Sequence, residues 1–347
     1  MPCGALSRTL TVPRRPRRII PLGRCFINLS VARCPVIETK AQFIQLFDDE
    51  AGQRLDNFLM RKLSGVPKTR IYKAIRTGEV RINKGRARPD RKLLSGDIVR
   101  IPPITTSGPT DSVTVPDRWF QRIERSIVHN DQHLMIIDKP TGLAVHGGSG
   151  VQFGLIESLR QMFPEQRYME LVHRLDRDTS GLVMIAKRAS TLRELHELLR
   201  GDGVDKRYFA LVAGKWPAHK ARIEASLSKS ALASGERVVR VSPEGRRSVT
   251  DFRVIDRYKT ATLVEAKPIT GRTHQIRVHA QHGGHPILGD EKYASEDQLA
   301  FGKTQGLKRL FLHAHSLKFV LGGTRYEFTA PLDRELRRVC EFMSQSS

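Results

Sequence analysis

The segment His173-Arg174-Leu175-Asp176-Arg177-Asp178-Thr179-Ser180-Gly181 leads directly into the apolar run Leu182-Val183-Met184-Ile185-Ala186. The apolar run is short and follows a glycine, which predicts a buried β-strand. The nine residues before it hold two acids, two arginines, a histidine, a threonine and a serine, which predicts a polar loop. Two interpretations of the loop stay open. Its charges could form ordinary surface ion pairs, or guanidinium groups could keep a carboxylate ionised, as a nucleophile requires.

Strand and helix patterns on both sides of this segment predict the fold class. Short apolar runs typical of strands lie at 134–137, 182–186, 208–212, 262–266 and 310–312. Stretches with helical spacing lie at 155–162, 191–199 and 273–281. Strands outnumber helices and often follow one another directly. We therefore predict an α+β fold for residues 123–342, with a long, mixed, mostly antiparallel sheet and flanking helices.

A smaller basic domain is predicted at residues 41–102. Leu55, Phe58, Leu59 and Leu63 share one helical stripe, and a second helix should begin at Pro67 and end before Gly78. Short strands are expected at 80–82 and 98–101. Between Gly52 and Arg100 there are 14 lysines and arginines against 4 acids, a net charge of 14 − 4 = +10. A solvated basic face is the ordinary explanation of such a charge, and RNA binding is the other.

This domain resembles an S4 RNA-binding domain. The resemblance rests on Arg54-Leu55-Asp56, Ser64-Gly65-Val66-Pro67, Gly78-Glu79-Val80 and Ser95-Gly96-Asp97. It implies α/β structure and contacts with RNA from cations on the domain surface. The residues predicted to bind RNA are Arg54, Lys68, Arg70, Lys73, Arg76, Arg81 and Lys84.

The composition of the whole chain also points to a polyanionic partner. The 347 residues include 59 lysines and arginines and 36 acids, so the formal charge is +23. Such a surplus usually persists because a polyanion neutralises it in use. No apolar stretch is long enough for a spanning helix, which favours nucleic acid over a membrane. The cysteines form no C-x-x-C pair, and three of the four precede residue 40, which fits a reducing compartment such as the cytoplasm.

The first forty residues are expected to stand apart from both domains as a basic, disordered extension. Residues 1–37 hold seven arginines, and no acid precedes Glu38. A transit peptide for organelle import, a basic tail and a start codon annotated too early would each give this pattern. Residues 103–122 are rich in proline, serine and glycine and are predicted to be a linker.

Two more polar clusters follow the opening segment along the chain. They are Lys206-Arg207-Tyr208-Phe209-Ala210-Leu211-Val212-Ala213-Gly214 and Gly271-Arg272-Thr273-His274-Gln275-Ile276-Arg277-Val278-His279. Together with the opening segment, Asp138-Lys139-Pro140-Thr141-Gly142 and Leu312-His313-Ala314, they resemble the RluA-type pseudouridine synthases. The resemblance covers residues 45–340.

The resemblance implies an enzyme that modifies RNA. A uridine is detached at its N1–C1′ bond, turned and rejoined through C5. Atoms are only rearranged, so no cofactor and no metal are expected. The S4-like domain adds the expectation of site-specific conversion of uridine to pseudouridine in 23S, the large-subunit ribosomal RNA. That RNA or its precursor particle would be the partner, with no membrane involved, and we expect a monomer.

The resemblance also assigns roles to individual residues. Asp176 is the predicted nucleophile, and Tyr208 is predicted to pack against the target base and to help move a proton. Arg277 should lie beside Asp176, where a buried bidentate pair would keep the carboxylate charged. Arg174 is expected to fill the space that a flipped base leaves, and Arg272 to contact phosphate.

Other interpretations of these residues remain. Tyr208 could be an ordinary core tyrosine, Arg277 could bind phosphate, and Asp178 would point away from Asp176 in an extended segment and is read as structural. The histidines at 274, 279, 282 and 285 are predicted to hydrogen-bond or pack rather than to bind zinc. The alternative function is an RNA-binding ribosome-assembly factor in which catalysis is absent or secondary.

Overall fold

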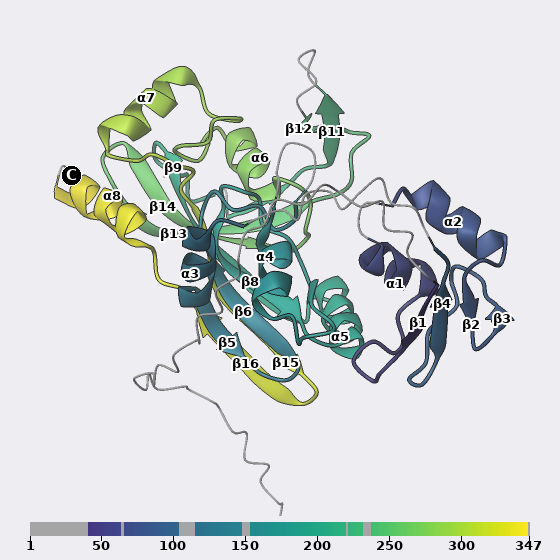
Figure 1. The fold of residues 1–347 in the computed structure, drawn as a ribbon. Coiled ribbons are helices and arrows are strands. Elements are labelled where there is room, and N and C mark those ends of the chain that lie inside the picture. The colour runs from purple at the N-terminus through teal and green to yellow at the C-terminus, as the bar shows by residue number, and fades with distance from the viewer. Residues whose placement is uncertain are drawn as a thin grey trace, which may run out of the picture. The chain divides into compact units, whose positions relative to one another are not determined.

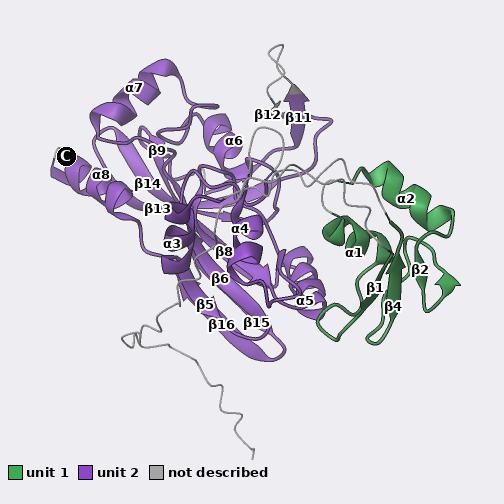
Figure 2. Ribbon diagram, viewed as in Figure 1, with its two compact units in different colours: residues 1–114 green, residues 115–347 purple. Residues whose placement is uncertain are grey.

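The computed structural model describes residues 41–63, 66–103, 115–147, 153–219, 221–231 and 237–345. The chain divides into two compact units, residues 1–114 and 115–347 (Figure 2). The predicted extension, residues 1–40, lies outside the described residues, as do residues 104–114 of the predicted linker. Within the described residues, no helix is both long and apolar enough to span a membrane.

The first unit is a small antiparallel sheet packed with two helices. Its strands, in the order β1-β4-β2-β3, are β1 (Gln42–Gln45), β2 (Arg81–Ile82), β3 (Gly85–Arg86) and β4 (Ile98–Ile101). The helices α1 (Leu55–Lys62) and α2 (Lys68–Arg76) form where predicted. Their apolar stripes share one buried cluster with β2 and β4. Gly78, with a φ of 76°, directly follows the C-cap of α2. β1 was not predicted, and Ser64 and Gly65 lie outside the described residues.

The second unit is built on a ten-stranded sheet (Figure 1). Eight strands follow the order β10-β13-β14-β9-β15-β8-β6-β5, while β16 pairs with β15 and β7 with β8. Their bounds are β5 (Ile127–Asn130), β6 (Leu134–Lys139), β7 (Glu170–Leu171), β8 (Ser180–Ala186), β9 (Val204–Ala213), β10 (Arg222–Glu224), β13 (Val249–Arg257), β14 (Ala261–Pro268), β15 (Leu312–Leu321) and β16 (Thr324–Thr329). In the described part of this sheet, β8 and β15 are the parallel pair and the other pairs are antiparallel. The predicted fold class is confirmed.

The helices of this unit include three that were predicted and three that were not. The predicted ones are α4 (Leu155–Met162), α5 (Ala189–Arg200) and α6 (Gln275–His282). The others are α3 (Asp117–Arg125), α7 (Glu296–Thr304) and α8 (Arg334–Gln345). A hairpin of β11 (Leu227–Ala231) and β12 (Arg237–Val241) forms a separate small sheet.

Two of the predicted boundaries need correction. The strand expected at 310–312 begins only at Leu312 and continues to Leu321 as β15. Leu310 and Phe311 precede it. Residues 117–122, placed in the linker, are the first six residues of α3. Ile123 of α3 is fully buried in the main core of the second unit, with Leu155 and Leu159 of α4, so this helix belongs to that unit.

The parallel join between β8 and β15 explains the glycine that ends the opening segment. Gly181 has a φ of 108° and lies opposite Ala314 in the register. A Cβ at Gly181 would overlap the carbonyl oxygen of Ala314, so the close approach needs glycine. Across the same join, Ser180 Oγ and His313 Nδ1 are hydrogen-bonded at 2.9 Å. The polar loop at 173–179 therefore enters the middle of the sheet, not an edge.

Candidate active site

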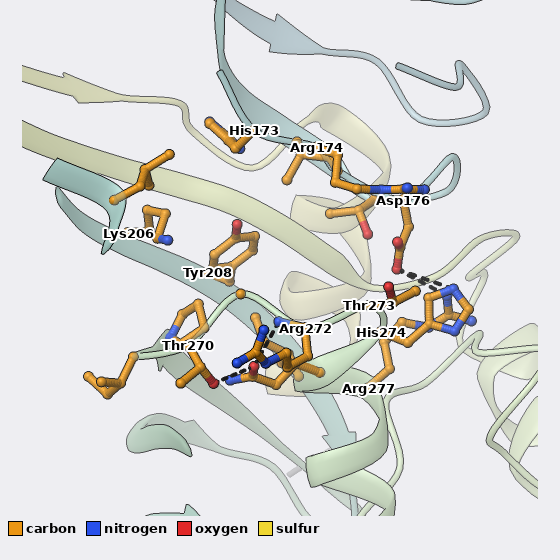
Figure 3. A pocket seen from close by; sticks show the side chains of 18 of the residues that line it. His173, Arg174, Asp176, Lys206, Tyr208, Thr270, Arg272, Thr273, His274 and Arg277 are labelled. Carbon is orange, nitrogen blue, oxygen red and sulfur yellow. Dashed lines mark hydrogen bonds and ion pairs between the residues drawn. The ribbon is translucent and has the colours of Figure 1, made fainter. Parts of the chain in front are cut away.

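A cavity of about 660 Å³ opens in the second unit where three polar segments meet (Figure 3). The loop before β8 supplies His173, Arg174 and Asp176. Strand β9 supplies Lys206 and Tyr208, and the turn before α6 with its first residues supplies the stretch from Pro268 to Arg277. The end of α5 and Leu312 of β15 complete the lining. The structure thus brings together the three clusters that the sequence singled out, across more than one hundred residues.

Asp176 lies partly buried at one end of this cavity. Its side chain is 18% exposed, and Oδ2 is 3.3 Å from Arg277 Nη1 and 3.8 Å from His274 Nε2. Within the described residues, Oδ1 has no hydrogen-bond partner. The carboxylate is therefore held at one oxygen by a buried cation and presents the other toward the cavity.

Arg277 has a second and closer partner, which corrects the predicted geometry. Its Nε and Nη2 donate to the two carboxylate oxygens of Asp290, at 2.8 and 2.7 Å. The bidentate pair expected with Asp176 is formed with Asp290 instead. The side chain of Arg277 is 6% exposed and that of Asp290 is 0% exposed, so the pair is buried. The two carboxylates keep the pKa of Arg277 above its usual value, against the effect of burial.

Asp290 is a site residue that sequence reasoning missed. It lies outside all three clusters, in the turn that follows α6, where no periodic pattern marks it. One signal was available, because Asp290 is the first acid after Glu265 and the stretch between them holds Arg272 and Arg277. A buried arginine in an acid-free stretch has to find a carboxylate elsewhere.

His274 is oriented by Tyr293, as a hydrogen-bonding histidine. Its Nδ1 is 2.7 Å from the Tyr293 hydroxyl, and burial lowers its pKa, so the ring is mostly neutral. The residue precedes α6 with a φ of 53°, the left-handed region that a non-glycine residue rarely adopts. This backbone turn aims the ring at Asp176.

Tyr208 forms a wall of the cavity beside Asp176. Its side chain points from β9 into the cavity, and the residue is 9% exposed. Among the described residues its hydroxyl has no hydrogen-bond partner. Burial, and then the charge of Asp176, raise the pKa of the phenol above its usual value. Tyr208 is thus a protonated phenol whose ring lines the cavity and whose hydroxyl has no hydrogen-bond partner in the described residues.

The loop that carries Asp176 is held from below by Lys139. Its Nζ donates to the carbonyl oxygens of Leu143 at 2.8 Å, Arg177 at 3.0 Å and Pro140 at 3.1 Å. Lys139 is fully buried, which lowers its pKa to about 7. The Gly142 amide also donates to the Arg177 carbonyl, at 3.0 Å. The motif at 138–142, to which the sequence assigned no role, therefore fixes the backbone next to Asp176.

The first residue of the loop is tied to β8. His173 Nε2 accepts a hydrogen bond from the Met184 amide at 3.2 Å, and burial lowers the pKa of His173 to about 3. A neutral ring with Nε2 as acceptor is therefore the stable form. Asp178, which the sequence predicted to be structural, forms an ion pair with the neighbouring Arg177 at 3.0 Å. No contact between Asp178 and Asp176 is found in the described residues.

The cations predicted to bind RNA fall into two groups, those that already form an ion pair within the protein and those that do not. Arg174 and Arg272 are exposed, line the cavity and form no ion pair within the described residues. In the first unit, Arg54 pairs with Asp56 at 2.6 Å and Arg70 with Glu79 at 2.7 Å, so two of the predicted RNA contacts are already engaged. The other five predicted contacts in that unit are exposed and form no ion pair within its described residues: Lys68, Lys73, Arg76, Arg81 and Lys84. A search of the described residues found no cluster of three potential metal ligands.

Comparison with known proteins identifies the class of this chain. Residues 133–282 match the family model described as RNA pseudouridylate synthase, and residues 53–99 match that of the S4 domain. The chain is 49% identical over 314 residues to ribosomal large subunit pseudouridine synthase C of Haemophilus influenzae, an alignment that covers 90% of this chain and 98% of that protein. For the protein of the same name from Escherichia coli K12, identity is 50% over 303 residues, covering 86% and 95%.

A solved structure agrees with these matches. The human protein RNA Pseudouridylate Synthase Domain Containing 4 aligns with a TM-score of 0.54 and 28% identity, over 66% of this chain and 96% of that one. The chain therefore belongs to the RNA pseudouridylate synthase family. It is a pseudouridine synthase, an isomerase that acts on RNA.

Proposed function

We propose that Asp176 is the nucleophile in the conversion of uridine to pseudouridine in large-subunit ribosomal RNA. One observation carries the assignment to Asp176: among the described residues it is the only acid that lines the cavity, which Tyr208 also lines, and its carboxylate lies 3.3 Å from the buried Arg277. The substrate is proposed because the relatives in Haemophilus influenzae and Escherichia coli are named for the large ribosomal subunit.

The chemistry balances without an added reagent. The N1–C1′ bond of uridine breaks and a C5–C1′ bond forms, while the proton on C5 is lost and N1 gains one. The carboxylate of Asp176 supplies the electron pair, at C1′ or at C6 of the base, or assists elimination to a glycal. The Arg277 guanidinium lies 3.3 Å from that carboxylate, and its own fixed position limits the reorganisation required.

Tyr208 supplies the surface against which the detached base turns. An aromatic ring replaces part of the stacking that a flipped base loses, worth about 1–3 kcal/mol per base. Because the phenol stays protonated, its hydroxyl can donate a proton or a hydrogen bond but is a poor base. Arg174 is exposed and lines the cavity, which supports its proposed role of filling the space in the RNA that the flipped base leaves.

The first unit is proposed to hold the RNA. Its net charge of +10 is carried on about fifty residues, and five of its predicted contacts are exposed cations without an ion pair in the described part of that unit. We propose residues 41–102 as the RNA-binding domain and a monomer as the working form. The bacterial origin of the relatives supports a cytoplasmic site of action.

The test is to map pseudouridine in ribosomal RNA from cells with the gene, without it, and with Asp176→Ala. We expect one or more large-subunit positions to lose the modification in both altered strains. Purified Asp176→Ala should still bind ribosomal RNA about as tightly as the wild type. Pseudouridine made by the purified Asp176→Ala protein would refute the nucleophile. If ribosome assembly fails in the strain without the gene but is normal in the Asp176→Ala strain, the assembly-factor function is favoured.

A further inference from the structure

The cavity has an uneven distribution of charge along its length. Asp176, Arg277 and His274 lie toward one end, and Lys206 and His173 lie toward the other (Figure 3). Arg200 also lines the cavity. Lys206 precedes Tyr208 by two residues on β9, so both side chains project from the same face of the strand. Their Cα atoms are about 7 Å apart at the usual rise of a strand. Lys206 thus lies one step along the cavity from the proposed base-stacking surface.

Lys206 brings an uncompensated positive charge to that end. Within the described residues its ammonium forms no hydrogen bond and no ion pair, although the side chain is partly buried. Burial lowers the pKa of Lys206, and the charge of Asp202, with which Lys206 forms no ion pair in the described residues, opposes that effect. Neutral His173 cannot offset the ammonium. A partly buried cation without a partner is unfavourable, which suggests that the partner arrives with the substrate.

Arg200 and Arg272 also line this cavity and form no ion pair among the described residues. Arg200 is the last residue of α5, and Arg272 lies in the turn before α6. Both are exposed, and the hydrogen bonds that Arg272 forms within the described residues are made by its backbone with Gln275, not by its guanidinium. These three cations have no ion pair in the described residues, and the described acid that lines the cavity is Asp176 at the other end, which favours an anion with several acceptor oxygens as the ligand. A carbonyl oxygen of a base would satisfy one of them at most.

We propose that Lys206, together with Arg200 and Arg272, forms a phosphate subsite that binds one backbone phosphodiester of the RNA, next to the nucleotide whose base stacks on Tyr208. This rests on the proposed function only in that the bound strand carries the target uridine. The subsite acts as a positioning device: it anchors the strand on the far side of Tyr208 and so fixes where C1′ sits relative to Asp176.

The first experiment measures binding to a 20-nucleotide oligouridylate as a function of salt. Lys206→Met removes the charge, Lys206→Arg keeps it, and Lys259→Met is the matched control, an exposed lysine in the β13–β14 turn that does not line the cavity. Lys206→Met should weaken binding about tenfold at low salt and reduce the slope of log K against log salt by about 0.7. Lys206→Arg should retain most of the slope. An equal effect of Lys206→Met and Lys259→Met would overturn the subsite.

The second experiment leaves the protein unaltered. A short RNA containing a uridine that the wild type converts is made with one neutral methylphosphonate at a time, at each linkage within two nucleotides of that uridine. One linkage should lower kcat/KM about tenfold for the wild type, and the same linkage should have little further effect for Lys206→Met. If no linkage affects the wild type, or if all affect both proteins equally, the subsite is wrong. If no uridine is converted, the proposed function fails, while the salt-slope experiment still decides the subsite.

Discussion

Arg277 donates to both oxygens of Asp290, at 2.8 and 2.7 Å, and makes only one longer contact, at 3.3 Å, to Asp176. Asp290 thereby fixes the plane of the guanidinium and leaves Nη1 for the proposed nucleophile. Asp176 is held at a single oxygen, which leaves its second oxygen available to the substrate. A carboxylate bound bidentately by Arg277 would have been less free to attack.

Asp290→Asn should impair both folding and catalysis. Breaking a buried ion pair leaves an uncompensated charge and costs about 3–5 kcal/mol, measured as the free energy of unfolding. We also expect kcat to fall roughly 100-fold, because a misplaced guanidinium misplaces Asp176. The control is Asp251→Asn, which breaks the exposed ion pair with Arg222 and should cost less than about 1 kcal/mol. Equal losses of stability would show that Asp290 does not hold Arg277.

Tyr208 should keep its proton over the whole working pH range. Its pKa is raised above the usual value of 10, so the phenolate forms only at still higher pH. The ratio of kcat/KM for wild type to that for Tyr208→Phe should therefore be flat from about pH 7 to 9.5. Tyr208→Ala should in addition lose the stacking surface, worth about 1–3 kcal/mol. A bend in the ratio near pH 8 would indicate that the phenolate acts as a base.

Gly181→Ala should be far more harmful than a glycine substitution at an open site. Both Gly181 and Gly284 have positive φ, at 108° and 85°, so alanine is strained at either one. That strain alone is about 1–2 kcal/mol. At Gly181 the new Cβ would also meet the Ala314 backbone, whereas at Gly284 nothing lies within 4 Å. Separating β8 from β15 should add about 1–3 kcal/mol and lower kcat. Equal free energies of unfolding for the two variants would contradict the role of this join.

The exposed cations of α2 should contribute to RNA affinity but not to the chemical step. Replacing Lys73 and Arg76 together by methionine should reduce the salt slope of RNA binding by up to about 0.7 for each charge. At saturating RNA, kcat should stay within about twofold of the wild type, because both residues belong to the first unit and the cavity to the second. Lys259→Met again controls for the loss of net charge. A large fall in kcat with an unchanged slope would argue against RNA binding by α2.

The sequence predicted the elements that depend on local patterns. The helices α4 and α6 and the strands β6, β8, β9 and β14 each carry an apolar periodicity that short-range sterics and burial enforce. It missed β1, β13 and β16, whose exposed faces weaken the apolar pattern. It also took the start of α3 for linker, because prolines and polar residues conceal a helix that buries only one residue completely, Ile123.

The sequence by itself determined the chemistry available to this protein: a carboxylate at 176, an aromatic ring at 208, an arginine at 277 and a basic domain in front of them. Tertiary structure alone decided how they are paired. Only the folded sheet places β9 two strands from β8, with β15 between them, and so brings Tyr208 beside Asp176. The packing of α6 pairs Arg277 with Asp290, and the buried Lys139, together with the Gly142 amide, fixes the loop that carries Asp176. These contacts join residues far apart in the chain, and their energies depend on burial and distance, which no local pattern records.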